Sequence, residues 1–103
     1  MPDDGKKLGR TMLEAFDGLT RLISTATDEE LPRLRASRAV LLQQLARLVD
    51  AHLDEADAHY QAATAALELA SATVELALQE MATVADAVVV TGQALELVAT
   101  LKP

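Results

Sequence analysis

The sequence predicts an all-α protein, and three observations lead to this prediction. Half of the 103 residues are hydrophobic, but Phe and Tyr occur once each and Trp is absent, so the core must consist of Leu, Ala and Val. No glycine or proline interrupts residues 33–91. Apolar residues recur at spacings of three and four, which is the period of a helix and not the period of two typical of strands.

The chain is long enough for one domain. Residues 1–7 contain Pro2 and Gly5 and carry little apolar surface, so we expect them to form a flexible N-terminal tail. Residues 8–103 are expected to form a single helical domain.

A first helix is expected over residues 8–26. Its apolar positions alternate at spacings of four and three and form one stripe: Leu8, Met12, Ala15, Leu19, Leu22 and Ala26. Gly9 and Gly18 each weaken a helix by about 0.5–1 kcal/mol relative to Ala. Packing against a neighbouring element must therefore stabilise this helix.

A second helix is expected over residues 29–52. Thr27 and Glu30 have capping-box spacing, in which the hydroxyl accepts from a backbone N–H and the carboxylate accepts from the Thr27 N–H. Pro32 suits the first turn, where its missing N–H removes no helical hydrogen bond. This segment is also the one strongly basic stretch of the chain, with Arg33, Arg35, Arg38 and Arg47.

A third helix is expected over residues 54–101. There, the positions that follow one another at alternating spacings of three and four, the three-four repeat, are almost all apolar. A second apolar stripe flanks it, so the apolar arc is about 160° wide at ~100° per residue. An arc this wide favours contact with two neighbours, as in a bundle, over a simple coiled coil. The repeat slips between Leu45 and Ala56, so the second and third helices are either continuous or broken near residues 50–59, and Gly92 is a second site for a kink.

A single rod from residue 33 to residue 101 would measure about 100 Å, far more than the first helix alone can cover. We therefore expect a helical hairpin that assembles as an antiparallel dimer, a four-helix bundle or a coiled coil. The large apolar residues on the repeat are the expected interface: Leu67, Val74, Met81, Val84 and Val88. Basic residues before position 48 and acidic residues after it favour an antiparallel pairing of the two regions.

The net charge of -7 disfavours attraction to nucleic acid or to anionic lipid. The most apolar stretch, residues 81–101, is interrupted by Asp86, Gln93 and Glu96, so no membrane insertion is expected. The chain lacks cysteine and an apolar run after its first basic residues, which favours a cytoplasmic location. The expected partners are a second copy of the chain, as a homodimer or higher homo-oligomer, and a helical protein.

One cluster offers metal-binding chemistry as an alternative function. His52, Glu55 and His59 are spaced i, i+3 and i+7, so they share one helical face. The spacing does not reproduce a recognised metal motif, and a solvated structural cluster explains it as well. No Ser or Thr has an adjacent His base, so we expect no enzymatic activity and no cofactor.

A second alternative comes from a resemblance. Residues 16–45, with Asp28-Glu29-Glu30-Leu31 before Leu34, Arg38, Leu41-Leu42 and Leu45, resemble the small helical chaperones of flagellar and type III secretion export. The resemblance covers under a third of the chain. It implies an acidic, helical and often dimeric protein that holds unfolded or helical clients on an apolar groove.

Overall fold

The all-α class is confirmed by the structure, a computed structural model that describes residues 6–48, 53 and 56–101. The described residues form the helices α1 (Lys6–Thr25), α2 (Leu31–Leu48), α3 (Ala58–Leu78) and α4 (Val84–Ala99), and none of them lies in a strand. None of these helices is both long enough and apolar enough to cross a bilayer. The first two helices lie close to their expected positions, although α1 begins inside the segment expected to be a tail.

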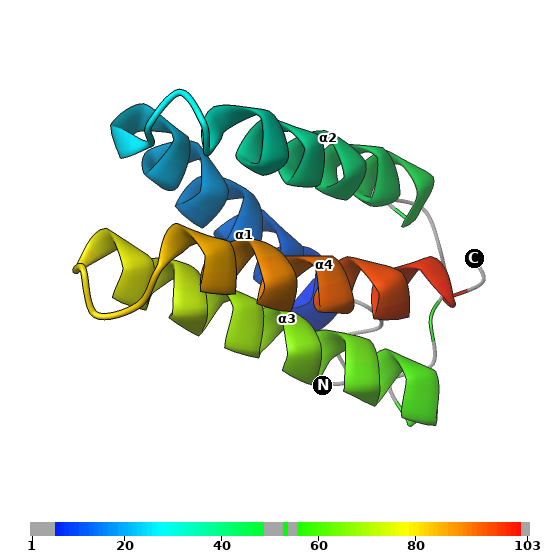
Figure 1. The fold of residues 1–103 in the computed structure, drawn as a ribbon. Helices are drawn as coiled ribbons and strands as arrows, with labels where there is room; N and C mark the ends of the chain where they lie inside the picture. Colours follow the sequence, from blue (N-terminus) through cyan, green and yellow to red (C-terminus); the bar gives the residue numbers. More distant parts are fainter. Residues whose placement is uncertain (1–5, 49–52, 54–55, 102–103) are drawn as a thin grey trace.

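The helices form two antiparallel hairpins that pack face to face (Figure 1). α1 lies beside α2 and α3, and α4 lies beside α3 and α2, whereas the pairs α1/α4 and α2/α3 are diagonal. The hairpins are stacked so that α1 runs parallel to α3 and α2 runs parallel to α4. The result is a bundle measuring 40 × 23 × 19 Å.

The apolar stripe expected for the first helix is buried. Leu8, Met12, Ala15, Leu19 and Leu22 are all at most 2 % exposed and line the centre of the bundle. Gly18 allows α1 to approach α3 closely, because a Cβ placed there would lie 3.1 Å from Cγ1 of Val74. This contact explains why a helix-weakening residue occupies the middle of α1.

The turn between α1 and α2 contains one of the two hydrogen bonds of the expected capping box, the one accepted by Glu30. The Glu30 carboxylate accepts a 2.9 Å hydrogen bond from the backbone N–H of Thr27, and the Thr27 carbonyl accepts from the N–H groups of Glu30 and Leu31. The helix then begins at Leu31, with Pro32 in its first turn.

The C-terminal half of α2 is attached to α4 by two polar side chains. Gln44 is buried, and its Nε2 donates a 3.0 Å hydrogen bond to the carbonyl of Leu95. Arg47 donates to the carbonyls of Leu101 at 2.8 Å and Val98 at 3.2 Å. Carbonyls at a helix C-terminus carry partial negative charge, so the Arg47 guanidinium is favourably placed there.

The expectation of one helix over residues 54–101 is wrong, because this segment is two helices joined by a tight turn. Glu80 has a φ of 61°, the left-handed conformation that reverses the chain after a helix. The N–H of Met81 donates to the Leu76 carbonyl at 2.8 Å, and the N–H of Glu80 donates to the Ala77 carbonyl at 3.1 Å. These two bonds define a Schellman motif, which terminates α3.

Side-chain caps start both helices of this second hairpin. Asp57 accepts a 2.7 Å hydrogen bond from the N–H of His59 at the start of α3, and Thr83 accepts a 3.0 Å bond from the N–H of Asp86 at the start of α4. α2 ends at Leu48 and α3 begins at Ala58, so of the two alternatives left open by the sequence, the break near residues 50–59 is the one present. α4 runs through Gly92 without interruption.

The expectation of two assembled chains depended on one long helix that a single chain could not cover. The break near residues 50–59 and the turn at Glu80 divide that helix. No long rod is left to cover, because the reversal at Glu80 folds α4 back onto α3 and α1 covers the same core. The radius of gyration is 13.3 Å, close to the ~13 Å expected for a folded monomer of this length. Dimerisation therefore stays a prediction that the packing no longer requires.

Glu80→Gly is expected to raise the free energy of unfolding by about 1 kcal/mol, because glycine adopts the left-handed conformation without the Cβ clash. Urea denaturation followed by circular dichroism measures the change. Ala72→Gly, at an exposed position inside α3, is the matched control and should lower stability by about 1 kcal/mol. Equal effects of the two glycines would contradict the assigned turn.

Gly18→Ala is expected to be less stabilising than Gly92→Ala. Both changes improve helix propensity by about 1 kcal/mol, but only the Gly18 methyl meets a neighbour, Val74, whereas space around Gly92 is open. A double-mutant cycle with Val74→Ala tests the contact. Removing the Val74 methyl groups should make Gly18→Ala more favourable, and an additive cycle would show that the two residues do not touch.

Candidate functional site

Two of the five residues expected at an interface lie inside the protein. Leu67 and Val74 are 0 % and 1 % exposed and belong to the core between α3 and its neighbours. They are unavailable to a partner in this fold. At these two positions the three-four repeat is covered by helices of the same chain.

The other three expected residues lie at the turn and at the start of α4. Met81 is 72 % exposed in the turn. Val84 and Val88 are partly buried and line a hollow of about 220 Å³ between the N-terminal ends of α2 and α4, together with Glu29, Glu30, Arg33 and Ala85. Both carboxylates and the guanidinium come from the α2 side of this hollow. This hollow is small, and only two of the five expected interface residues, Val84 and Val88, line it.

The metal-binding alternative gains no support from the structure. His59 is exposed in the first turn of α3, while His52 and Glu55 lie outside the described residues. Within the described ranges, no three His, Asp or Glu side chains gather closely enough to hold a metal ion.

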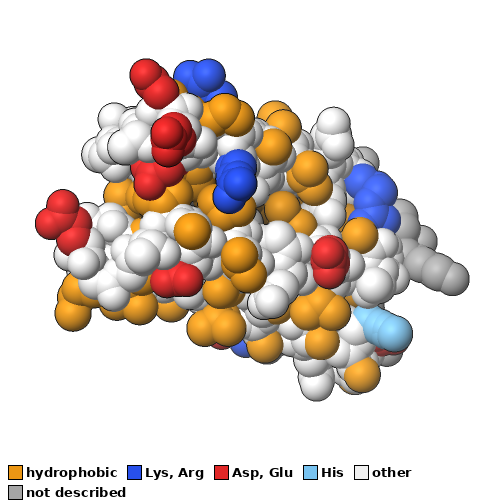
Figure 2. All heavy atoms as spheres, in the orientation of Figure 1, with side chains coloured by type: hydrophobic (Ala, Val, Ile, Leu, Met, Phe, Trp, Pro, Cys, Tyr) orange, Lys and Arg blue, Asp and Glu red, His pale blue; other side chains and the backbone are white. Residues whose placement is uncertain are grey.

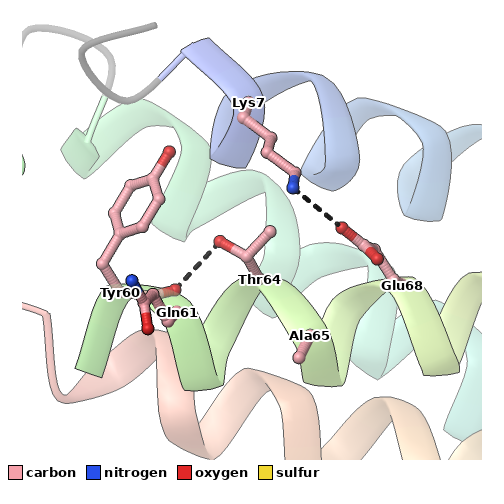
Figure 3. A pocket seen from close by; sticks show the side chains of 6 residues that line it. All are labelled: Lys7, Tyr60, Gln61, Thr64, Ala65 and Glu68. Atoms are coloured by element: carbon pink, nitrogen blue, oxygen red, sulfur yellow. Dashed lines mark hydrogen bonds and ion pairs between the residues drawn. The ribbon is translucent and has the colours of Figure 1, made fainter. Parts of the chain in front are cut away.

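A polar pocket of about 400 Å³ lies between the first turn of α1 and α3 (Figure 3). Lys7 reaches across its mouth to Glu68 at 3.7 Å. The Tyr60 hydroxyl accepts a buried 3.1 Å hydrogen bond from the backbone N–H of Leu8, and the Thr64 hydroxyl donates to the Tyr60 carbonyl at 2.9 Å. Gln61 and Ala65 complete the lining.

The polar groups of this pocket stabilise the fold. The N–H of Leu8 lies in the first turn of α1, where it has no carbonyl partner within the helix, and Tyr60 supplies the missing acceptor. The Thr64 hydroxyl bonds to its own helix, and Lys7 joins α1 to α3. This arrangement aligns the first turns of two parallel helices.

Among the described residues, acidic side chains of α3 pair with basic side chains of α1, and these two helices run parallel. Arg21 of α1 bonds to Glu75 of α3 and contacts Asp17 at 3.2 Å. The hydrogen bond that Arg21 donates to the Glu75 carboxylate is the main cause that raises the pKa of Arg21 above its usual value. On α2, Arg38 lies over the Phe16 ring at 5.8 Å and donates to the Thr20 hydroxyl.

Exposed aliphatic side chains also lie on both helices of the second hairpin. We define the α3–α4 outer face as Leu69 and Leu76 of α3 with Val89 and Leu97 of α4, whose exposed fractions are 59 %, 41 %, 58 % and 37 %. Counting outward from the turn at 79–83, Leu69 lies level with Gln93, between Val89 and Leu97 on the neighbouring helix. Ala66 of α3 and Val90 of α4 are partly buried and pack against the core.

The sequence alone contains a signal for part of this face. Leu69, Leu76 and Leu97 belong to the second apolar stripe that widened the arc to about 160°. Only part of that arc meets α1, α2 or the other helix of the hairpin, so the residues at its outer edge are exposed.

Comparison with protein-family models, with curated proteins and with solved structures found no match to this chain.

Tyr60→Phe is expected to lower the free energy of unfolding by about 1–3 kcal/mol, because it leaves the buried N–H of Leu8 without an acceptor. Urea denaturation measures the loss, and hydrogen exchange of the Leu8 amide should become faster. Lys7→Gln is the control at the same pocket and should change stability by less than about 0.5 kcal/mol, since its ion pair is exposed. If Tyr60→Phe matched that control, the hydroxyl would have no structural role.

Proposed function

We propose that this protein is a non-catalytic protein–protein interaction module, an adaptor, assembly subunit or chaperone-like protein, that binds a helical partner through the α3–α4 outer face. The observation that supports this proposal is that Leu69 and Leu76 of α3 and Val89 and Leu97 of α4 are all exposed on two helices that pack against each other. Single exposed leucines are common on protein surfaces, but a contiguous group of large aliphatic side chains is typical of interaction sites.

The shape of the face favours a helix as the partner. Two packed antiparallel helices present a shallow groove between ridges, and a third helix can place its own apolar side chains in that groove. The spacing along α3 from Leu69 to Leu76 is two helical turns, which matches the i, i+7 repeat of an amphipathic helix. A partner helix of this kind would bury most of the exposed aliphatic surface.

The alternative functions that the sequence suggests would use the α3–α4 outer face differently. Self-association would place a second copy on the same face, whereas an export-chaperone role would place an unfolded or helical client there. A metal-binding bundle would use His59, which lies at the opposite end of α3 from the turn. Only the first two explain why aliphatic side chains are exposed on α3 and α4.

Site-specific photo-crosslinking in the cells that express the protein tests the proposal. A photoreactive amino acid at Leu69 or Val89 is expected to give a covalent adduct with one defined protein, because both positions lie in the bound face. The adduct is identified by mass spectrometry. Leu76→Ser should reduce its yield several-fold while changing the free energy of unfolding of the protein by less than about 0.5 kcal/mol, since the side chain is exposed.

The matched control is Leu13, which is 58 % exposed on α1 and lies outside this face. The same photoreactive residue at Leu13 should give no adduct with that protein. Equal adducts at Leu13 and Leu69, or none at Leu69 and Val89, would exclude the α3–α4 outer face as the binding site.

A further inference from the structure

The two hairpins carry opposite charge. Residues 56–101 contain six acidic residues and no Lys or Arg: Asp57, Glu68, Glu75, Glu80, Asp86 and Glu96. Residues 6–48 contain eight basic and five acidic residues. In Figure 2, Asp and Glu side chains interrupt the hydrophobic surface over α4, while Lys and Arg side chains lie mainly over α2 and near its ends.

Half of the acidic groups of the second hairpin have a partner inside the protein. Glu68 and Glu75 pair with Lys7 and Arg21 of α1, and Asp57 caps α3. The remaining three, Glu80, Asp86 and Glu96, belong to the turn and to α4, away from α1. The first hairpin thus compensates the acidic charge on one side of α3 only.

These remaining carboxylates border the α3–α4 outer face. Asp86 precedes Val89 by three residues and Glu96 follows it by seven, so all three side chains share one side of α4. Asp86 also lies level with Leu76 of α3, counted from the turn, and Glu80 lies in the turn itself. The exposed aliphatic group is therefore flanked by negative charge and has no positive charge on its own hairpin.

From this arrangement we propose that the partner segment is a basic amphipathic helix, with one apolar stripe flanked by Lys or Arg. This inference rests on the proposed function and specifies its partner. The apolar stripe would cover Leu69, Val89 and Leu97, while the flanking cations would face Asp86, Glu96 and Glu80. Complementary charge at the rim selects the partner and speeds its association, and burial of the aliphatic side chains supplies the affinity.

A second copy of the chain fits this face less well. A two-fold symmetric contact brings the same surface of both copies together, so the acidic border of one copy would lie against the acidic border of the other. Like charges opposed across an interface oppose association. The charge of the face thus argues for a different chain as its occupant.

Two designed peptides of about 18 residues test the inference, since that length supports a helix on binding. Both carry leucines at i, i+3, i+4 and i+7, and their polar positions are all Lys in one and all Glu in the other. Isothermal titration calorimetry with the full chain should show the Leu/Lys peptide binding at least about ten-fold more tightly. Raising NaCl from roughly 50 to roughly 500 mM should weaken that binding several-fold.

Paired charge reversals separate the local charge of the face from the net charge of the protein. Glu80→Lys with Glu96→Lys should reduce Leu/Lys binding about ten-fold and improve Leu/Glu binding. Glu14→Lys with Asp28→Lys on the first hairpin changes the net charge by the same amount and should leave Leu/Lys binding within about two-fold. Circular dichroism confirms that both variants are folded.

The outcomes distinguish the two proposals. Equal binding of both peptides, or binding of neither, overturns the basic partner, while adducts at Leu69 and Val89 in cells would still support the interaction function. Equal loss of binding in both charge variants shows attraction to net charge alone and also overturns the inference. Light scattering that detects a dimer abolished by Leu69→Ser would identify a second copy as the occupant and overturn it as well.

Discussion

The reversal of the chain at Glu80 is the constraint on which the rest of the structure depends. The segment from α3 to α4 is apolar over a wide arc, and a continuous helix of this length would have no other part of the chain long enough to cover it. The left-handed residue and the two Schellman hydrogen bonds end α3 and direct α4 back along it. Each helix of the hairpin then buries the apolar side of the other.

The first hairpin completes the core, and its two helices do so in different ways. α1 contributes a stripe of buried aliphatic residues and approaches α3 closely at Gly18. α2 buries fewer residues, and polar groups hold its C-terminal half, with Gln44 and Arg47 bonded to carbonyls of α4. Because α1 and α2 cover only one side of the second hairpin, the other side remains a surface of leucine and valine bordered by carboxylates.

This division of the molecule connects the fold to its proposed function. One side of α3 and α4 provides the stability of the domain through burial. The opposite side provides a surface whose aliphatic groups favour a helix and whose charge favours a cationic one. A substitution at Leu67 or Val74 therefore acts on folding, whereas a substitution at Leu69 or Leu97 acts on the surface.

The sequence by itself determined the helical class, the stripe from Leu8 to Leu22 and the turn at Thr27 and Glu30, because each follows from short-range periodicity or from a local hydrogen bond. It did not reveal the turn at Glu80, since the left-handed position usually holds glycine and here holds a residue that also suits a helix. Only the tertiary structure decided which half of the apolar arc is buried. Periodicity shows that side chains share a face of a helix, but which neighbour covers that face depends on where the chain turns back.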